Sequence, residues 1–178
     1  MGKSVRLDDL KALREESGAS VNDCRVALES SGGDLAKARA ALRQRAGQIA
    51  QARQGRATRQ GRVEAYVHHD GRLAALVEVN CETDYVARTP EFSQFCREIA
   101  MHVAAMNPRF LQPEDIPSQG GASGEDVAST CLLEQPFVKD QGTTVRELLK
   151  ALIAKTGENV VIRRFVQFTV GESSSSAP

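Results

Sequence analysis

The chain has 178 residues with a formal net charge of zero, 41% hydrophobic and 26% charged residues, as in an ordinary globular protein. This length accommodates one domain and a small extra module, and the balanced charge excludes a global field that would direct the protein to nucleic acid or membrane. The apolar runs are too short to span a bilayer and the N-terminus lacks the apolar region of a signal peptide, so we expect a cytoplasmic protein without a membrane partner.

Residues 1–46 predict a module of three short helices. The helical stripes consist of Leu7, Leu10 and Leu13, then Val21, Cys24 and Leu28, then Leu35, Ala38 and Leu42. Gly18 is typical of the position just past a helix end, and Ser20 is a favoured N-cap. Three short helices with few large apolar residues make only a small core, so we expect this module to dock onto a partner.

A basic stretch follows, with no acid between Leu35 and Val63. Its cations are Lys37, Arg39, Arg43, Arg45, Arg53, Arg56, Arg59 and Arg62. We expect a basic helical linker at 47–60. One interpretation of residues 37–62 is an RNA-binding strip, which would make this an RNA-binding protein. We favour a solvated or protein-binding face without direct nucleic acid contact, because no aromatic residue interleaves the arginines for base stacking.

From Gly61 the apolar period changes to two, which predicts β-strands. Val63, Ala65 and Val67 alternate with polar residues. Asp70-Gly71 is a strong hairpin signal because both residues tolerate positive φ. The return strand is expected at about residues 72–79, with Ala75, Val77 and Val79 on one face.

Two longer helices are predicted after the hairpin. The first begins at Thr89-Pro90, where threonine caps the helix and proline suits its first position, and it ends at Asn107-Pro108. The second begins with a capping box formed by Thr144 and Glu147 and closes at Gly157.

The remaining segments complete an α+β core at 61–171. Residues 107–131 are expected to be irregular, with a short helix near 125–132. The final strand has its apolar residues at Val160, Ile162, Val166, Phe168 and Val170. We expect these on its buried face, interrupted by Arg164. The predicted core is one antiparallel sheet of at least three strands with helices on one side, followed by a disordered serine-rich tail at 172–178.

Catalytic motifs are absent from the sequence. It has no phosphate-cradling glycine-rich loop, G-x-S-x-G or HExxH. The four cysteines are Cys24, Cys81, Cys96 and Cys131. They form no CxxC pair, which argues against a zinc site and favours buried thiols. His102 is interpreted as a structural histidine. We therefore expect no catalytic residue, no cofactor and no metal ion.

The densest polar cluster is the segment NCETDYVAR at residues 80–88, between a predicted strand and a predicted helix. One alternative makes it an enzyme site with Cys81 as nucleophile, although no activating partner lies nearby in sequence. Another is an ordinary loop with Tyr85 packed inward. A loop that presents an acid and then a large aromatic is better suited to protein contact.

Five segments in order resemble the elongation factor Ts family. They are Asp23-Cys24-Arg25 with Ala27-Leu28, NCETDYVAR at 80–88, AMHVAAMNP at 100–108, QPFVKD at 135–140, and GEN with RRF between Gly157 and Phe165. The resemblance runs from about Leu7 to Glu172. It implies a three-helix module like the ubiquitin-associated fold, followed by an antiparallel core. The single hairpin is similar to the short form of the family, whose members are known as homodimers.

The resemblance also implies a function, which is guanine-nucleotide exchange on the translation GTPase elongation factor Tu. In this family the loop that matches Thr83, Asp84, Tyr85 and Val86 inserts between two helices of the GTPase and displaces the elements that hold magnesium. Tyr85 would be the wedge and Asp84 would hydrogen-bond near the loop tip.

The resemblance further implies contacts from the N-terminal module, with Arg14, Val21 and Asn22 as candidates. This chain departs from the family in having Val21-Asn22 where methionines are usual, and Tyr85 where phenylalanine is usual. From the residues alone, the strongly apolar last strand leaves a sheet edge to cover, and we predict a homodimer formed through the core.

Overall fold

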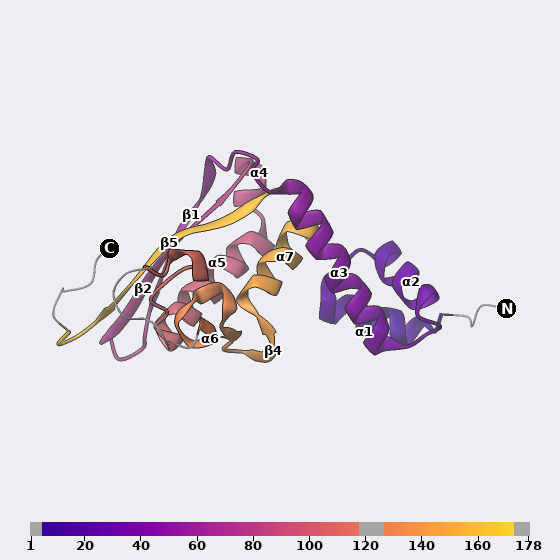
Figure 1. The fold of residues 1–178 in the computed structure, drawn as a ribbon, viewed down its shortest axis with the longest axis horizontal. Coiled ribbons are helices and arrows are strands. Elements are labelled where there is room, and N and C mark those ends of the chain that lie inside the picture. The colour runs from indigo at the N-terminus through magenta and orange to yellow at the C-terminus, as the bar shows by residue number, and fades with distance from the viewer. Residues whose placement is uncertain (1–4, 118–126, 173–178) are drawn as a thin grey trace. The chain divides into compact units, whose positions relative to one another are not determined.

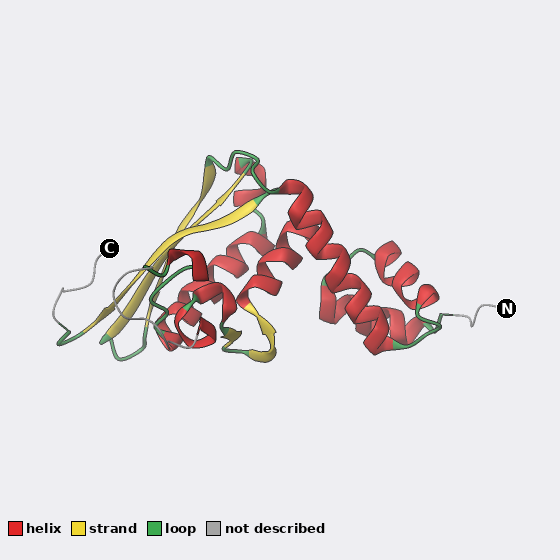
Figure 2. Cartoon of the chain, in the orientation of Figure 1, coloured by secondary structure: helices red, strands yellow, loops and turns green. Residues whose placement is uncertain are grey.

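Three helices come first along the chain, and strands and further helices follow (Figure 2). The computed structural model describes residues 5–117 and 127–172. The longer helices are α1 Leu7–Ser17, α2 Val21–Ser30, α3 Leu35–Arg53, α5 Pro90–Met106 and α7 Val145–Thr156 (Figure 1). Short helices are α4 Asp84–Ala87 and α6 Val127–Thr130, with 3-10 turns at Pro113–Asp115 and Leu132–Glu134. The strands are β1 Gln60–Val67, β2 Leu73–Cys81, β3 Pro136–Phe137, β4 Asp140–Thr144 and β5 Val160–Thr169. The predicted α+β class is confirmed.

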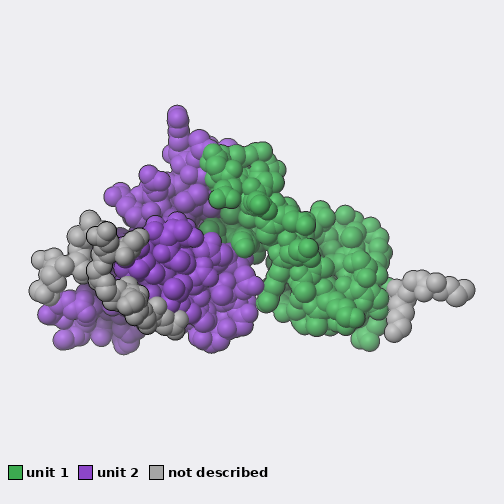
Figure 3. All heavy atoms as spheres, viewed as in Figure 1, with its two compact units in different colours: residues 1–56, 149–159 green, residues 57–148, 160–178 purple. Residues whose placement is uncertain are grey.

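The chain divides into two compact units (Figure 3). Unit 1 comprises residues 1–56 and 149–159, and unit 2 comprises 57–148 and 160–178. Helix α3 is continuous through residues 46 and 47, so the third helix of the expected module and the first half of the expected linker are one helix. Of the expected disordered tail at 172–178, residues 173–178 lie outside the described residues.

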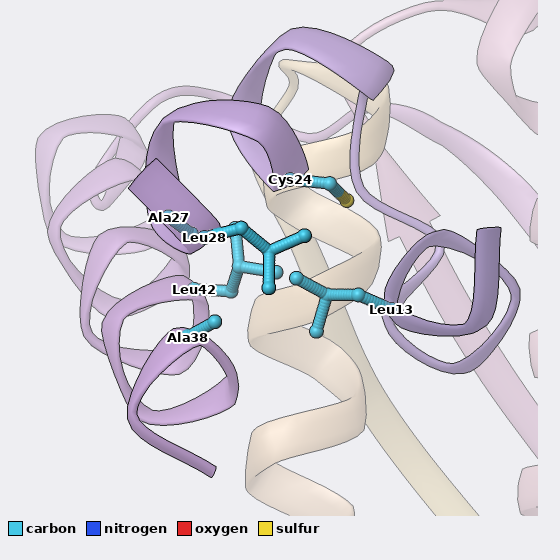
Figure 4. Packing of buried hydrophobic residues seen from close by; sticks show 6 residues of the cluster. All are labelled: Leu13, Cys24, Ala27, Leu28, Ala38 and Leu42. Atoms are coloured by element: carbon cyan, nitrogen blue, oxygen red, sulfur yellow. The ribbon is translucent and has the colours of Figure 1, made fainter. Parts of the chain in front are cut away.

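A small apolar cluster holds the three helices of unit 1 together. Its buried members are Leu13, Cys24, Ala27, Leu28, Ala38 and Leu42, whose side chains converge between α1, α2 and α3 (Figure 4). The turns between the helices follow from local chemistry. Gly18 ends α1 with φ of 63°, and the Ser20 Oγ accepts a hydrogen bond from the Asp23 N–H. The alanine-rich composition of this cluster keeps the core as small as the sequence predicted.

A three-stranded antiparallel sheet in the order β1-β2-β5 forms the centre of unit 2. Helix α5 packs against these three strands and covers one face of the sheet. On that face Ala75, Val77 and Val79 of β2 are fully buried, as the alternation predicted. The second, two-stranded sheet pairs β3 with β4. Both β1 and β5 are edge strands of the larger sheet.

The prediction that the apolar residues of the last strand are buried holds at its start and is wrong after Ile162. Val160 and Ile162 are buried, but Phe168 is 60% exposed. The cause is a β-bulge: Val79 pairs with Ile162 while its neighbour Glu78 pairs with Arg164, which leaves Arg163 as an extra residue on β5. One extra residue in a strand reverses the facing of every later side chain.

The bulge adds the later residues of β5 to an apolar surface on the sheet face opposite α5, which we call the outer sheet face. It consists of Val63, Ala65 and Val67 of β1, Ala74 and Leu76 of β2, and Val166 and Phe168 of β5. Val63, Val67, Leu76 and Phe168 are all exposed. At one end of this face Arg164 Nε and Glu78 Oε2 form an ion pair at 2.7 Å.

His102 on α5 is fully buried and uses both ring nitrogens. The Val138 N–H donates to Nδ1 at 3.2 Å, so the proton lies on Nε2, which donates to the Gln135 Oε1 at 2.9 Å. Burial lowers the pKa of His102 below the ordinary value of 6.5, and the hydrogen bond to Gln135 opposes this only in part. The ring is therefore a neutral structural group, in line with the sequence interpretation.

This depressed pKa predicts acid sensitivity. Above pH 6.5 the unfolded chain also holds a neutral histidine, and the contribution of His102 to stability is complete. As the pH falls from 6.5 towards the folded pKa, the unfolded state binds the proton first and the free energy of unfolding decreases. We expect urea unfolding at pH 7.5 and pH 5.5 to show a smaller loss in His102→Gln than in the wild type. A His69→Gln variant, altered at an exposed position, should keep the wild-type difference.

Candidate functional site: the loop after strand β2

The segment NCETDYVAR begins in the last residues of β2 and ends just before α5. Its middle forms the one-turn helix α4, with Thr83 as the N-cap. The Thr83 Oγ1 accepts from the Val86 N–H at 3.3 Å, and the Thr83 carbonyl accepts from the Ala87 N–H at 3.3 Å. Threonine at this position therefore turns the chain sharply out of the strand and into the helix.

The loop is anchored from inside unit 2. Val86 is 4% exposed and Ala87 is also buried, and α4 packs against β1, β2 and α5. At its start the Cys81 thiol donates to the Thr83 carbonyl at 3.1 Å. At its end the Thr89 Oγ1 donates to the Val86 carbonyl at 2.8 Å. These contacts hold the loop backbone from both sides.

Tyr85 points outward from this anchored turn, with 78% of its surface exposed. It does not pack into the core, which removes the interpretation of an ordinary loop with an inward aromatic. Asp84 and Arg88 flank it and form an exposed ion pair, with Arg88 Nη2 and Asp84 Oδ2 3.0 Å apart. A large exposed aromatic beside a carboxylate is a surface suited to binding another protein.

The candidates in the N-terminal module lie in unit 1, around the turn between α1 and α2. Arg14 is exposed in the last turn of α1, and Val21 and Asn22 are exposed in the first turn of α2. The Asn22 Oδ1 accepts from Arg25 Nη2 at 3.0 Å, so this asparagine has a polar neighbour on its own helix. The loop residues Thr83, Asp84, Tyr85 and Val86 lie in unit 2.

Several arginines of the basic stretch are engaged in ion pairs with acids of this chain. Arg39 pairs with Glu16 at 2.7 Å and Arg45 with Asp23 at 2.9 Å, which ties α3 to α1 and α2. Arg62 pairs with Glu64 at 3.0 Å. These guanidinium groups serve the fold, which weakens the RNA-binding interpretation of residues 37–62.

The thiols are poorly placed for chemistry. All four cysteines are reduced and buried. Burial raises the pKa of Cys96 to about 12, and the Cys81 thiol is fully buried and directed at the Thr83 carbonyl. Within residues 5–117 and 127–172 no group of three or more His, Cys, Asp or Glu side chains could hold a metal ion. In the same part of the chain no helix is both long and apolar enough to cross a membrane.

Sequence reasoning missed two parts of the site. Arg88 was not singled out, although an acid followed four residues later by a base is the spacing of a helical ion pair. The thiol contact between Cys81 and the Thr83 carbonyl has no sequence signal, because Cys81 precedes the helix and donates along an irregular turn. Both residues support the pair Asp84 and Tyr85 that the sequence identified.

The fold and the loop together present one exposed aromatic side chain from an anchored turn. Residues 10–130 match the family model described as elongation factor TS. The chain is 45% identical to the elongation factor Ts of Rubrobacter xylanophilus, over 93% of this chain and 98% of that protein. It is 43% identical to that of Methylacidiphilum infernorum, over 97% and 98%, and 42% identical to that of Carboxydothermus hydrogenoformans, over 92% and 88%.

This chain belongs to the elongation factor Ts family. The similarity covers nearly the whole length of this chain and of the first two relatives.

Proposed function

We propose that this protein is a guanine-nucleotide exchange factor for elongation factor Tu and acts in the cytoplasm through the loop at Thr83–Val86. Its membership of the elongation factor Ts family supports the partner and the reaction. The observation that carries the loop assignment is Tyr85, which is 78% exposed on a backbone that is held from within the core. An aromatic that stabilised only its own fold would be covered.

The mechanism follows from differential affinity. A GTPase retains GDP through phosphate contacts and a magnesium ion, so an exchange factor must bind the nucleotide-free state better than the GDP-bound state. Tyr85 acts as a wedge between two helices of elongation factor Tu and disturbs the elements that hold magnesium. Asp84 accepts a hydrogen bond beside the wedge, and Arg88 holds its carboxylate in place before binding.

The anchored loop suits this role because its backbone must keep its conformation while Tyr85 displaces elements of the partner. Val86 anchors the loop to the core, since its side chain is buried while that of Tyr85 is exposed. A second contact is made by the three-helix module, through Arg14, Val21 and Asn22. Once one of the two surfaces has bound the partner, the other surface is held near its own binding site at a high effective concentration.

The direct test measures release of a fluorescent GDP analogue from elongation factor Tu. We expect a substoichiometric amount of this protein to accelerate release, because an exchange factor is regenerated in each cycle. If a saturating amount left the release rate unchanged, the proposed function would be wrong.

We also propose that the chain forms a homodimer in which the outer sheet faces of two copies pack together. Large exposed apolar patches mark interaction surfaces in soluble proteins. The sequence predicted a dimer through an uncovered sheet edge, and the exposed face offers a larger apolar area than an edge strand. The ion pair between Arg164 and Glu78 borders the face and would lie at the rim of the interface.

A charge on the outer sheet face tests this dimer. We expect wild-type protein to scatter light as a dimer and Phe168→Lys to scatter as the 19.3 kDa monomer, because a buried ammonium is strongly unfavourable. Leu7→Lys in unit 1 is the matched control, since Leu7 is 63% and Phe168 60% exposed. It should stay dimeric. A wild-type protein that is monomeric at micromolar concentration would rule out the dimer.

A further inference from the structure

The connection between the two units contains an asparagine contact that the loop at Thr83–Val86 does not account for. The chain passes between the units at Arg56–Ala57, at Leu148–Leu149 and at Asn159–Val160. The second crossing lies inside helix α7. The first and third lie in segments without helix or strand.

The Asn159 side chain joins these two irregular crossings. The Asn159 Nδ2 donates to the Arg56 carbonyl at 2.9 Å, between residues 103 positions apart. Arg56 and Asn159 are the last residues of unit 1 before the chain enters unit 2 on each path. Asn159 is 7% exposed, so this bond is shielded from competing water.

The backbone before Asn159 is arranged to present this amide. Gly157 ends α7 with φ of 71°, and its N–H bonds the Ile153 carbonyl. The Thr156 Oγ1 then accepts from the Glu158 N–H at 3.4 Å. Asn159 follows this capped turn and is the last residue before β5.

We propose that Asn159 is a positioning residue for nucleotide exchange, which it serves by tying the two irregular connections together. This inference rests on the proposed function, in which both units bind the same GTPase. After the first unit binds, the second finds its surface at an effective concentration set by the freedom of the connection. Loss of the bond lengthens the free connection, so it weakens binding without altering the wedge at Tyr85.

The test compares Asn159→Asp with a matched control. The aspartate keeps the shape but faces the Arg56 carbonyl with an oxygen in place of a donor. Gln167→Glu makes the same chemical change at the bond from Gln167 Nε2 to the Ala104 carbonyl, 2.8 Å long and wholly inside unit 2. The milder Asn159→Ala, which adds no buried charge, serves if the aspartate variant does not fold.

We expect Asn159→Asp to raise KM for the GDP-bound GTPase roughly three- to tenfold, the range of one net hydrogen bond, with kcat within about twofold. Trypsin should cut faster after Arg56 and Arg59 in Asn159→Asp, and at the wild-type rate in Gln167→Glu. A lower kcat with unchanged KM, equal effects of both variants, or no change in KM and proteolysis would each overturn the positioning role.

The two proposals fail in different ways. If wild-type protein did not exchange nucleotide, the proposed function would fall and the role of Asn159 in exchange with it. If the wild type exchanged nucleotide and the Asn159 variants showed the same KM and the same proteolysis as the wild type, the exchange function would stand. The positioning role alone would then be wrong.

Discussion

Tyr85→Ala is expected to remove most of the exchange activity while the protein stays folded. Tyr85 is 78% exposed, and substitutions at such positions usually change the free energy of unfolding by no more than about 0.5 kcal/mol. An aromatic anchor at the centre of an interface contributes roughly 2 kcal/mol or more, which corresponds to at least about thirtyfold in kcat/KM. Stopped-flow GDP release and thermal melts of the same preparation measure the two effects separately.

Tyr85→Phe separates the ring from the hydroxyl. Phenylalanine is the usual family residue, so we expect exchange as fast as wild type or faster. A large loss would mean that the partner provides a hydrogen-bond partner for the hydroxyl, and a purely steric wedge would be incomplete. A Tyr85→Ala protein that melted early and exchanged normally once folded would contradict the wedge assignment altogether.

Gly61→Ala is expected to be the most damaging small substitution in unit 2. Gly61 is the second residue of β1 and lies opposite Asn80 with φ of 151°, and an added Cβ would clash with the Val79 carbonyl oxygen. That oxygen belongs to the neighbouring strand and cannot move without breaking the sheet. Strain and overpacking together predict a loss of roughly 2–4 kcal/mol in the free energy of unfolding.

Gly47→Ala is the matched control for this change. Gly47 lies inside α3, and an added Cβ would meet no heavy atom within 4 Å. Alanine is the better helix former by about 1 kcal/mol, so this variant should be more stable than wild type. Chemical denaturation of both variants gives the comparison. Equal stability of Gly61→Ala and wild type would show that β1 can separate from β2 at its start without cost.

The sequence predicted most of the elements because local signals and tertiary packing agree in them. The capping box appears as expected: the Thr144 N–H donates to the Glu147 Oε2 at 2.9 Å, and the Glu147 N–H to the Thr144 Oγ1 at 3.2 Å. Helix α5 begins at Pro90 and ends before Asn107, as the Thr89-Pro90 and Asn107-Pro108 signals indicated. The short helix expected near 125–132 appears as α6, Val127–Thr130.

Features that depend on pairing across the chain could not be predicted. The bulge at Arg163 is defined only by the register of β5 against β2, and nothing in the residues of β5 marks it. The exposure of Tyr85 likewise depends on Val86 and Ala87 finding places in the core. Asn159 reads as a polar residue after a helix, and its partner lies 103 residues away.

The extra residue at Arg163 has a consequence for comparing relatives of this protein. Side chains alternate between the two faces of a strand, so one inserted residue moves every later side chain to the opposite face. Deleting Arg163 would turn Val166 and Phe168 towards α5 and leave Phe165 and Gln167 outside. A one-residue gap at this point of an alignment therefore distinguishes relatives with an apolar outer sheet face from relatives without one, even where all later residues are identical.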